Sequence, residues 1–226
     1  MTKNNMKISS VTRSKEEAKA SYDKMSKWYD ILAGSSEKKY TDAGLEKLNA
    51  QDGETILEIG FGTGHSNLSL ARSVGNSGKV EGLDMSEGMY NITRSRLETA
   101  GLSDRVNLTC GDAVALPFEA DHFDAIFISF TLELFDTPEI PMVLHECHRV
   151  LKQGGRIAVV ALAKKEKIAV SLYEWFHKLM PTTVDCRPIF VRRSLENAGF
   201  HLLDLSEISM WGLPVEVVVA EKGSGS

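Results

Sequence analysis

Glu58-Ile59-Gly60-Phe61-Gly62-Thr63-Gly64 is the stretch of this chain that decides its fold. An apolar run over residues 55–59 leads into it and predicts a short buried strand, and a helical pattern over residues 65–74 follows it. Glycines between a strand and a helix let the backbone turn sharply and let a ligand lie against the turn. Nucleotide ligands of α/β folds bind at the carboxyl ends of the strands. The stretch therefore predicts a nucleotide-type cofactor site on the first strand of an α/β sheet.

The rest of the chain continues the alternation of strand and helix. We expect strands over residues 55–59, 80–83, 106–109, 123–129, 157–161, 202–206 and 215–220, and helices over residues 65–74, 86–100, 139–151, 172–180 and 194–198. Such alternation is typical of a Rossmann-like, doubly wound α/β fold. The last two strands flank the loop Trp211-Gly212-Leu213-Pro214, which is short enough for a hairpin. The prediction is a seven-stranded, mostly parallel sheet that ends in an antiparallel C-terminal hairpin.

We expect the chain to form a single domain over residues 1–222. Its expected parts are an N-terminal helical cover, a cofactor-binding core, an acceptor-side helical insertion and the C-terminal hairpin, over residues 14–50, 54–162, 163–200 and 201–222. Within the cover, Ser14 and Glu17 form a capping-box pattern, Gly34-Ser35-Ser36 ends the first helix, and a second helix covers residues 40–48. Residues 223–226 alternate glycine and serine and are interpreted as a remnant of the expression vector.

The composition limits the class of partner. Of 226 residues 42% are hydrophobic, which suffices for one full core, and a net charge of -5 argues against a dedicated nucleic-acid binder. Three scattered cysteines without a CxxC pair predict neither a disulfide framework nor a metal site. No stretch of about 18 apolar residues could span a bilayer, so we expect a protein of the reducing cytoplasm without stable membrane insertion. The sequence does not determine the oligomeric state.

The residues around the glycines indicate the kind of cofactor. Asp84 ends the second expected strand, twenty residues after Gly64 (84 minus 64), and an acid there can accept hydrogen bonds from both hydroxyls of a ribose. The glycine spacing is GxGxG, whereas a dinucleotide fingerprint is GxGxxG. Glu58 stands two residues before Gly60, which suits a cationic ligand such as S-adenosylmethionine better than a phosphate. A nucleotide-dependent oxidoreductase is therefore the less favoured alternative.

Further motifs follow in an order that points to a family. Gly111-Asp112-Ala113 follows the third expected strand, Leu116-Pro117-Phe118 comes next, and Arg149-Val150-Leu151-Lys152-Gln153-Gly154-Gly155 precedes the fifth strand. In this order the set resembles the class I S-adenosylmethionine-dependent methyltransferases. The layout is most similar to the ubiquinone/menaquinone C-methyltransferase family and its small-molecule relatives, over about residues 22–161. The resemblance is specific for the cofactor, S-adenosylmethionine, and poorly specific for the acceptor.

The resemblance implies a role for each matching position. The implied cofactor-binding residues are Tyr22, Tyr29, Glu58, Gly60, Gly62, Thr63, Gly64, Asp84, Met85, Asp112, Ala113 and Ser129. In this assignment the glycines line the methionine part of the cofactor, Thr63 holds its charged end, and Asp84 holds the ribose. Met85 lies against the adenine, whose edge Asp112 and Ala113 read. Asp84 could instead cap the following helix, but Ser86 is the better cap candidate, which leaves Asp84 for the ribose. Asp112 could form an Asx turn with the backbone ahead of it.

The acceptor side departs from the quinone enzymes. After the fourth expected strand those enzymes carry a basic, asparagine-containing stretch, whereas this chain has the acidic and apolar Thr131-Leu132-Glu133-Leu134-Phe135-Asp136. Glu133 is the first candidate for a catalytic residue because this loop is expected beside the transferred methyl group, and Tyr29 and His177 follow. We expect a small, apolar or aromatic acceptor, such as a quinone precursor or another lipid-like molecule. A thiol, an amine or an arsenical acceptor, and a non-catalytic cofactor-binding protein, are the alternatives.

Overall fold

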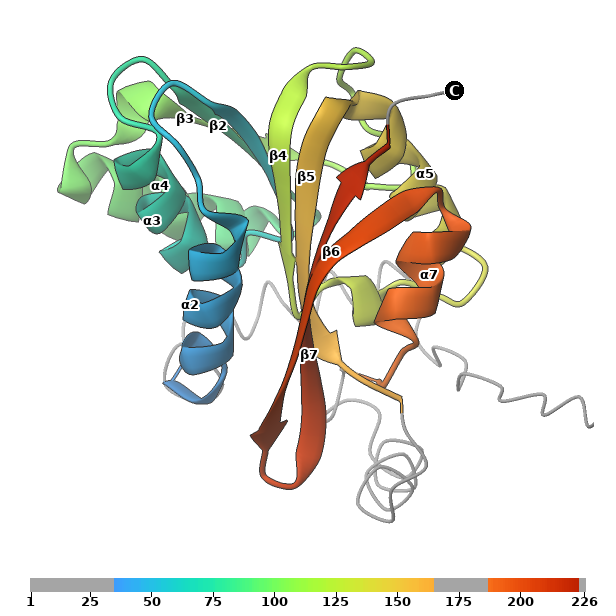
Figure 1. The fold of residues 1–226 in the computed structure, drawn as a ribbon. Helices are drawn as coiled ribbons and strands as arrows, with labels where there is room; N and C mark the ends of the chain where they lie inside the picture. The colour runs from blue at the N-terminus through green and yellow to red at the C-terminus, as the bar shows by residue number, and fades with distance from the viewer. Residues whose placement is uncertain (1–34, 165–186, 224–226) are drawn as a thin grey trace, which may run out of the picture.

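Residues 35–164 and 187–223 are described by the computed structural model of this chain, and they contain one seven-stranded sheet (Figure 1). The strands are β1 Thr55–Ile59, β2 Lys79–Asp84, β3 Val106–Cys110, β4 Phe123–Ser129, β5 Leu151–Leu162, β6 Phe200–Met210 and β7 Leu213–Lys222. Their order across the sheet is β3-β2-β1-β4-β5-β7-β6. Neighbours among β1 to β5 are parallel, and β7 is antiparallel to β5 and to β6. The expected fold class is confirmed.

The position of β1 explains why a ligand site forms at one edge of the sheet. β1 pairs with β2 on one side and with β4 on the other, so the strand order switches direction at β1. Ile56 and Leu57 are fully buried, as expected of a parallel strand with both faces covered. The glycine-rich stretch begins directly after Ile59, at the carboxyl end of β1. Open α/β sheets bind ligands at this switch point.

Helices cover both faces of the sheet (Figure 1). One face carries α2 Ser35–Leu48, α3 His65–Ser73 and α4 Glu87–Ala100, and the other carries α5 Ile140–Val150 and α7 Val191–Asn197. A separate group of buried apolar side chains fills each layer. The buried positions of α5 are those that its periodicity predicts, namely Ile140, Val143, Leu144, Cys147 and Val150. The sheet is therefore doubly wound, as expected.

The start of α4 shows which of two candidate residues caps the helix. The Ser86 hydroxyl accepts a hydrogen bond from the backbone N–H of Met89 (3.1 Å), which makes Ser86 the N-cap of the helix. Asp84 does not cap the helix in this way, because its carboxylate accepts a hydrogen bond from the backbone N–H of Ser86 instead (2.9 Å). The choice of Ser86 over Asp84 as the cap of α4 is therefore confirmed.

Two helix boundaries differ from the expectation. α2 begins at Ser35 rather than at residue 40, so Ser35 and Ser36 start a helix instead of ending one. α5 ends at Val150, and β5 already begins at Leu151. Gly154-Gly155 therefore lies inside β5, at a register shift against β4, and does not stop the helix. β4 pairs with Leu151 and again from Arg156 onward, so residues 152–155 form an irregular segment between two paired parts of the strand.

The C-terminal hairpin is longer than expected. Its turn consists of Trp211 and Gly212, with φ angles of +50° and +84°, and Leu213 already pairs with Met210. Leu213 and Pro214 therefore belong to β7 and not to the loop. A two-residue turn with positive φ at both positions matches the twist of paired strands, which explains why both strands continue to it.

Two expected helices cannot be compared with the structure, because they fall outside residues 35–164 and 187–223. They are the helices expected from Ser14 and over residues 172–180. Within the described ranges, no helix is long and apolar enough to cross a membrane.

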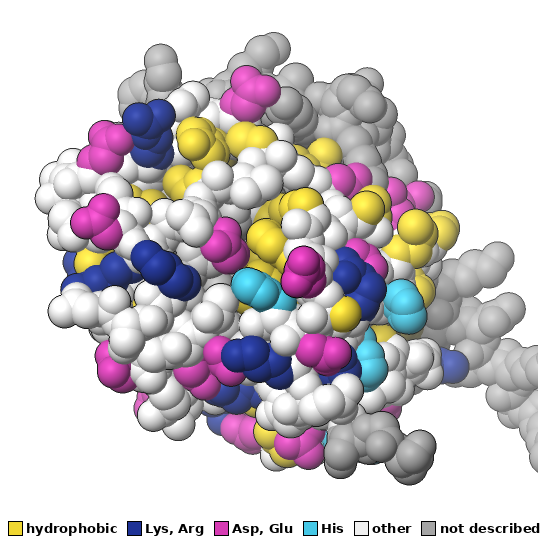
Figure 2. All heavy atoms as spheres, turned by 90° about the horizontal axis from the view of Figure 1, so that it is seen from above, with side chains coloured by type: hydrophobic (Ala, Val, Ile, Leu, Met, Phe, Trp, Pro, Cys, Tyr) yellow, Lys and Arg dark blue, Asp and Glu magenta, His cyan; other side chains and the backbone are white. Residues whose placement is uncertain are grey.

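Figure 2 views the end of the molecule at which the parallel strands begin and β7 ends. Basic and acidic side chains are interspersed there, with histidines among them.

Candidate functional site

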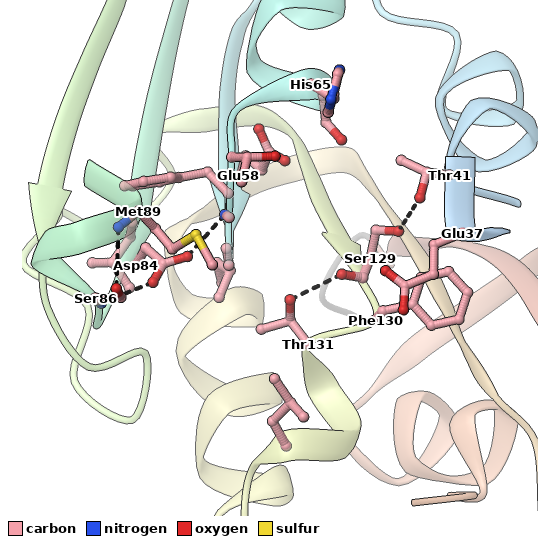
Figure 3. Close-up of a pocket in the computed structure, with 18 of the residues that line it drawn as sticks. Glu37, Thr41, Glu58, His65, Asp84, Ser86, Met89, Ser129, Phe130 and Thr131 are labelled. Carbon is pink, nitrogen blue, oxygen red and sulfur yellow. Dashed lines mark hydrogen bonds between the residues drawn. The ribbon is translucent and has the colours of Figure 1, made fainter. Parts of the chain in front are cut away.

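A cavity of about 570 Å³ lies at the carboxyl ends of β1, β2 and β4 (Figure 3). Its wall combines the glycine-rich stretch, the end of β2, the start of α3, part of α2 and the loop after β4. In Figure 3, Asp84, Ser86 and Met89 lie on one side, and Thr41, Ser129 and Phe130 lie on the other. A volume of this size is usual for a small-molecule site. The structure thus joins segments that lie far apart in the sequence.

The glycine-rich stretch has a backbone shape that side chains would prevent. Gly60 has φ +75°, and a β-carbon at this position would collide with the side chain of Thr131 in the loop after β4. Gly64 has φ +85°, and a β-carbon there would lie 2.6 Å from Cγ2 of Thr93 in α4. The absence of both side chains lets β4 and α4 approach the turn closely. Gly62, with φ +51°, has nothing within 4 Å of its β-carbon position and leaves bare backbone in the cavity wall, whereas Gly64 is not among the lining residues.

Asp84 is held in place by two backbone donors. Its Oδ2 accepts a hydrogen bond from the N–H of Gly62 (2.9 Å), and its Oδ1 accepts one from the N–H of Ser86 (2.9 Å). These bonds tie the end of β2 to the glycine-rich stretch. Each oxygen of a carboxylate can accept more than one hydrogen bond, so an aspartate fixed in this way can also receive ligand hydroxyls.

Glu58 is a buried acid in the cavity wall, with 2% of its surface exposed. Burial raises its pKa to about 8, and the negative charge of Asp84 acts in the same direction. Hydrogen bonds from Asn67 and Ser66 of α3 to the carboxylate oppose that rise. At pH 7 the group is therefore largely protonated when no ligand is bound. A cation in the cavity would favour the charged form.

Of the three residues Gly111-Asp112-Ala113 after β3, only the first and the last line the cavity. Gly111 and Ala113 line the cavity, as does Met85 after β2. Asp112 is not among the lining residues, and its Oδ1 accepts a hydrogen bond from the backbone N–H of Val114 (3.1 Å). This bond is the Asx turn that was the second interpretation of Asp112. The adenine role of Asp112 stays a prediction.

The far wall of the cavity is formed by α2 and by the residues after β4. The hydroxyls of Thr41 and Ser129 share a hydrogen bond (2.9 Å), and the Thr131 hydroxyl donates to the carbonyl of Ser129 (2.9 Å). Phe130 lines the cavity with φ +48°, which is uncommon for a residue with a side chain and recurs at functional sites. Glu37 of α2 brings a carboxylate to the same wall. This wall thus combines acidic groups with the apolar side chains of Phe130 and Leu134.

Glu133 does not lie where the sequence suggested. Its side chain is fully buried in the short helix η3 Leu132–Leu134, and it is absent from the residues that line the cavity. Its Oε1 accepts a hydrogen bond from the backbone N–H of Leu162 (3.2 Å), at the end of β5. Burial raises the pKa of Glu133 to about 8. The neighbours Leu134 and Phe135 line the cavity instead, because a single helical turn points successive side chains in different directions.

The remaining candidates lie outside the described residues or outside the cavity. Tyr22, Tyr29 and His177 belong to the first group, so their roles stay predictions. Within residues 35–164 and 187–223, no group of three or more His, Cys, Asp or Glu side chains could hold a metal ion. Cys110 is exposed, Cys147 is buried, and neither lines the cavity.

Sequence reasoning missed the wall opposite Asp84. Glu37 was overlooked because residues 34–36 were read as the end of a helix, so α2 was expected to begin only after Glu37. Phe130 follows the fourth strand directly, and that position at the carboxyl end of a central strand was the signal that could have identified it. Leu45 and Leu68 carried no such signal, since an apolar position on an amphipathic helix reads as core.

Comparisons with known proteins identify the relatives of this chain. The model of the ubiE/COQ5 methyltransferase family matches residues 1–186. Demethylmenaquinone methyltransferase of Oceanobacillus iheyensis is 32% identical over 162 residues, which cover 71% of this chain and 67% of that protein. The solved structure of a SAM-dependent methyltransferase from Aquifex aeolicus has a TM-score of 0.63 at 23% identity and covers 80% of this chain and 89% of its own. A geranyl diphosphate methyltransferase in complex with GPP and sinefungin has a TM-score of 0.68 at 16% identity, over 82% and 78%.

Proposed function

The chain belongs to the ubiE/COQ5 methyltransferase family, and from this premise we propose that it methylates a carbon atom of a small, apolar aromatic acceptor. The chain is an S-adenosylmethionine-dependent methyltransferase with the Rossmann-like fold of the class I enzymes. The proposal concerns which acceptor is methylated and which residues bind the cofactor and the acceptor. It rests above all on one observation: one cavity has the glycine-rich cofactor motif on one side and, on the other, the apolar side chains of Phe130, Leu134 and Phe135 together with several acidic groups.

Three features of the cavity fit S-adenosylmethionine. Asp84, fixed by two backbone donors, would accept hydrogen bonds from the ribose hydroxyls. Glu58 offers a buried carboxyl group next to the bare backbone at Gly60, which suits the cationic end of the cofactor. Met85 and Ala113 add apolar surface for the adenine. When bound, the cofactor supplies an electrophilic methyl group on a sulfonium.

The opposite half fits an aromatic ring that carries hydroxyl groups. Phe130, Leu134 and Phe135 line it with apolar surface, and Leu45 and Leu68 extend that surface onto α2 and α3. The acidic side chains that line this side are Glu37, Asp42, Asp136 and Glu139, and Lys38 beside them pairs with Asp42. Ionised carboxylates only accept hydrogen bonds, so they favour a ring with hydroxyl donors over one with carbonyl oxygens. A quinol, the reduced form of a quinone precursor, has this chemistry.

The side chains of the cavity would contribute binding, orientation and proton transfer. The apolar half would align the ring and exclude water, and orientation of this kind supplies much of the acceleration of a displacement reaction. Carbon methylation releases one proton from the acceptor, and Glu37 is the acid on the described wall that we assign to receive it. We place Glu133 behind the wall, where it would act only through the loop that contains it. Tyr29 and His177 stay candidates.

The experiment supplies ¹³C-methyl-labelled S-adenosylmethionine together with 1,4-naphthalenediol kept reduced under anaerobic conditions. We expect a carbon-methylated product by mass spectrometry and NMR, and little or no product from 1,4-naphthoquinone, which lacks the hydroxyl donors. A Glu37→Gln variant should lose most of the turnover, whereas Glu46→Gln, an exposed acid of the same helix, should keep it. Glutathione, a primary amine and arsenite are run in parallel.

The outcomes separate the alternatives. A methylated thiol, amine or arsenical without any methylated ring would contradict the proposed acceptor and leave the cofactor chemistry intact. Arsenite is the least expected of the three, because neither described cysteine lines the cavity. Equal turnover of Glu37→Gln and Glu46→Gln would remove Glu37 from the mechanism.

A further inference from the structure

A buried arginine outside the cavity connects two distant segments behind the acceptor half. Arg187 is fully buried, and its Nη1 donates a hydrogen bond to Oγ1 of Thr137 (2.9 Å). Its Nη2 donates to the backbone carbonyl of Phe135. Both acceptors belong to the loop between β4 and α5. The planar guanidinium therefore holds two positions of that loop from one side chain.

The backbone next to Arg187 is itself anchored to the sheet. The N–H of Ile189 donates to the carbonyl of Leu162 (2.9 Å), and the N–H of Lys164 donates to the carbonyl of Ile189 (2.9 Å). Ile189 thus forms a parallel bridge with Ala163 beyond the end of β5. β5 lies between β4 and β7 in the sheet, so the backbone next to Arg187 is bonded to an interior strand.

The loop that Arg187 holds depends on such outside contacts. Its helix η3 is a single turn with one described internal bond, from the N–H of Leu134 to the carbonyl of Thr131 (3.0 Å). Short helices of this kind have little stability of their own. Yet Leu134, Phe135 and Asp136 of this loop line the cavity. Their placement therefore requires ties from elsewhere in the fold.

The charges around Arg187 explain why a cation is tolerated there. Burial lowers the pKa of Arg187, and the nearby acids Asp136 and Glu133 oppose that shift. Glu133 in turn binds the N–H of Leu162, one residue before the bridge that anchors Arg187. The arginine and Glu133 thus attach the same loop to the same end of β5, from two directions.

We propose that Arg187 is a positioning residue for the acceptor, which acts by holding Leu134, Phe135 and Asp136 at the cavity wall. This inference rests on the proposed function, since it assigns that wall to the acceptor. Arg187 touches neither half of the cavity directly. Its loss should therefore impair acceptor use and leave cofactor binding in place, because the glycine-rich stretch and Asp84 make no described bond to the loop residues 132–137.

The test compares Arg187 with Arg156, a partly exposed arginine that also binds backbone carbonyls. Arg156 donates to the carbonyls of Leu48 and Asn49 and pairs with Glu54, and it is not a cavity residue. We expect Arg187→Met to raise KM for 1,4-naphthalenediol about tenfold or more, with a smaller fall in kcat, and to change the affinity for S-adenosylhomocysteine less than about twofold. Arg156→Met should lower the melting temperature comparably without altering KM. Arg187→Lys should recover part of the loss.

A second readout does not depend on turnover. In protein with ¹³C-methyl leucine, bound to S-adenosylhomocysteine, Arg187→Met should shift or broaden the signals of Leu134 and leave those of Leu68, on α3, in place. Arg156→Met should move neither. Unchanged Leu134 signals in Arg187→Met would overturn the inference, and so would a KM equal to that of the wild type. If wild-type protein does not methylate the ring, the proposed acceptor fails, and the Leu134 signals still decide the role of Arg187.

Discussion

Glu58 and Glu133 are both buried acids, and burial raises the pKa of each to about 8. Only one of the two lines the cavity. Glu58 follows a central strand and faces the cavity, where Asn67 and Ser66 bind its carboxylate. Glu133 lies in a single helical turn and points away from the cavity to the backbone of Leu162. The part of the cavity that we assign to the cofactor is formed at the ends of neighbouring parallel strands, by the glycine-rich stretch, Asp84 and Ala113. The part that we assign to the acceptor also depends on α2 and on the contact of Arg187 with the loop after β4.

The largest expected effect concerns the cofactor half. Asp84→Ala should weaken the binding of S-adenosylmethionine about a hundredfold, since hydrogen bonds to a charged group contribute about 1.5–3 kcal/mol each. Calorimetry against S-adenosylmethionine and S-adenosylhomocysteine measures the loss. Asp104→Ala, an exposed acid outside the cavity, is the control and should bind like the wild type. Tight binding by Asp84→Ala would break the assignment of the ribose site.

The next effect tests whether the two halves meet at the glycine-rich stretch. Gly60→Ala should cost about 1–3 kcal/mol of folding free energy, because it combines a positive φ with a collision against Thr131. Gly101→Ala has a similar φ in open space and should cost less. Denaturant titration of the two variants gives the difference. Adding Thr131→Gly to Gly60→Ala should restore part of the stability, and no recovery would show that the contact is unimportant.

A smaller effect is the dependence of the melting temperature on pH, which tests whether Glu133 is protonated in the folded protein. An acid whose pKa is raised in the folded state stabilises the protein fully below its unfolded pKa of about 4.5, and this stability is lost as the pH rises towards about 8. Melting temperatures should therefore fall over this range, and Glu133→Gln should flatten the decline. Equal slopes for Glu133→Gln and the wild type would contradict a buried neutral Glu133. Glu146→Gln, whose acid has a pKa lowered mainly by Arg149, should not flatten it.

The smallest expected effect is the release of a fraction of a proton from Glu58 when the cofactor binds. Without ligand, Glu58 is largely protonated at pH 7 because its pKa is about 8, and a cationic ligand should lower that pKa and release the proton. The binding enthalpy of S-adenosylmethionine at pH 7 should then vary with the ionisation enthalpy of the buffer. Glu58→Gln should abolish this dependence. Proton release that persists in Glu58→Gln would assign it to another group.

The outcome for particular residues shows what a sequence can predict. The fold class and the burial of α5 were predicted well, because each depends on a local pattern or on the topology of a parallel sheet. The glycine-rich stretch and Asp84 lie at the cavity, and their roles toward the cofactor stay predictions. Glu133 does not line the cavity, because its side chain binds the backbone of Leu162, and its catalytic role stays a prediction. Arg187 binds the loop at Phe135 and Thr137 from 50 residues and more away in sequence, a contact that no local pattern predicts.

The sequence by itself therefore determined the class of fold, the cofactor and the edge of the sheet at which the site lies. These follow from strand and helix periodicity and from glycines whose missing side chains are visible in the sequence. Only the tertiary structure showed that Glu37 and Phe130 line the cavity while Glu133 does not. The physical reason is that the loop after β4 has few hydrogen bonds of its own, so the directions of its side chains depend on contacts with distant segments such as the end of β5 and Arg187.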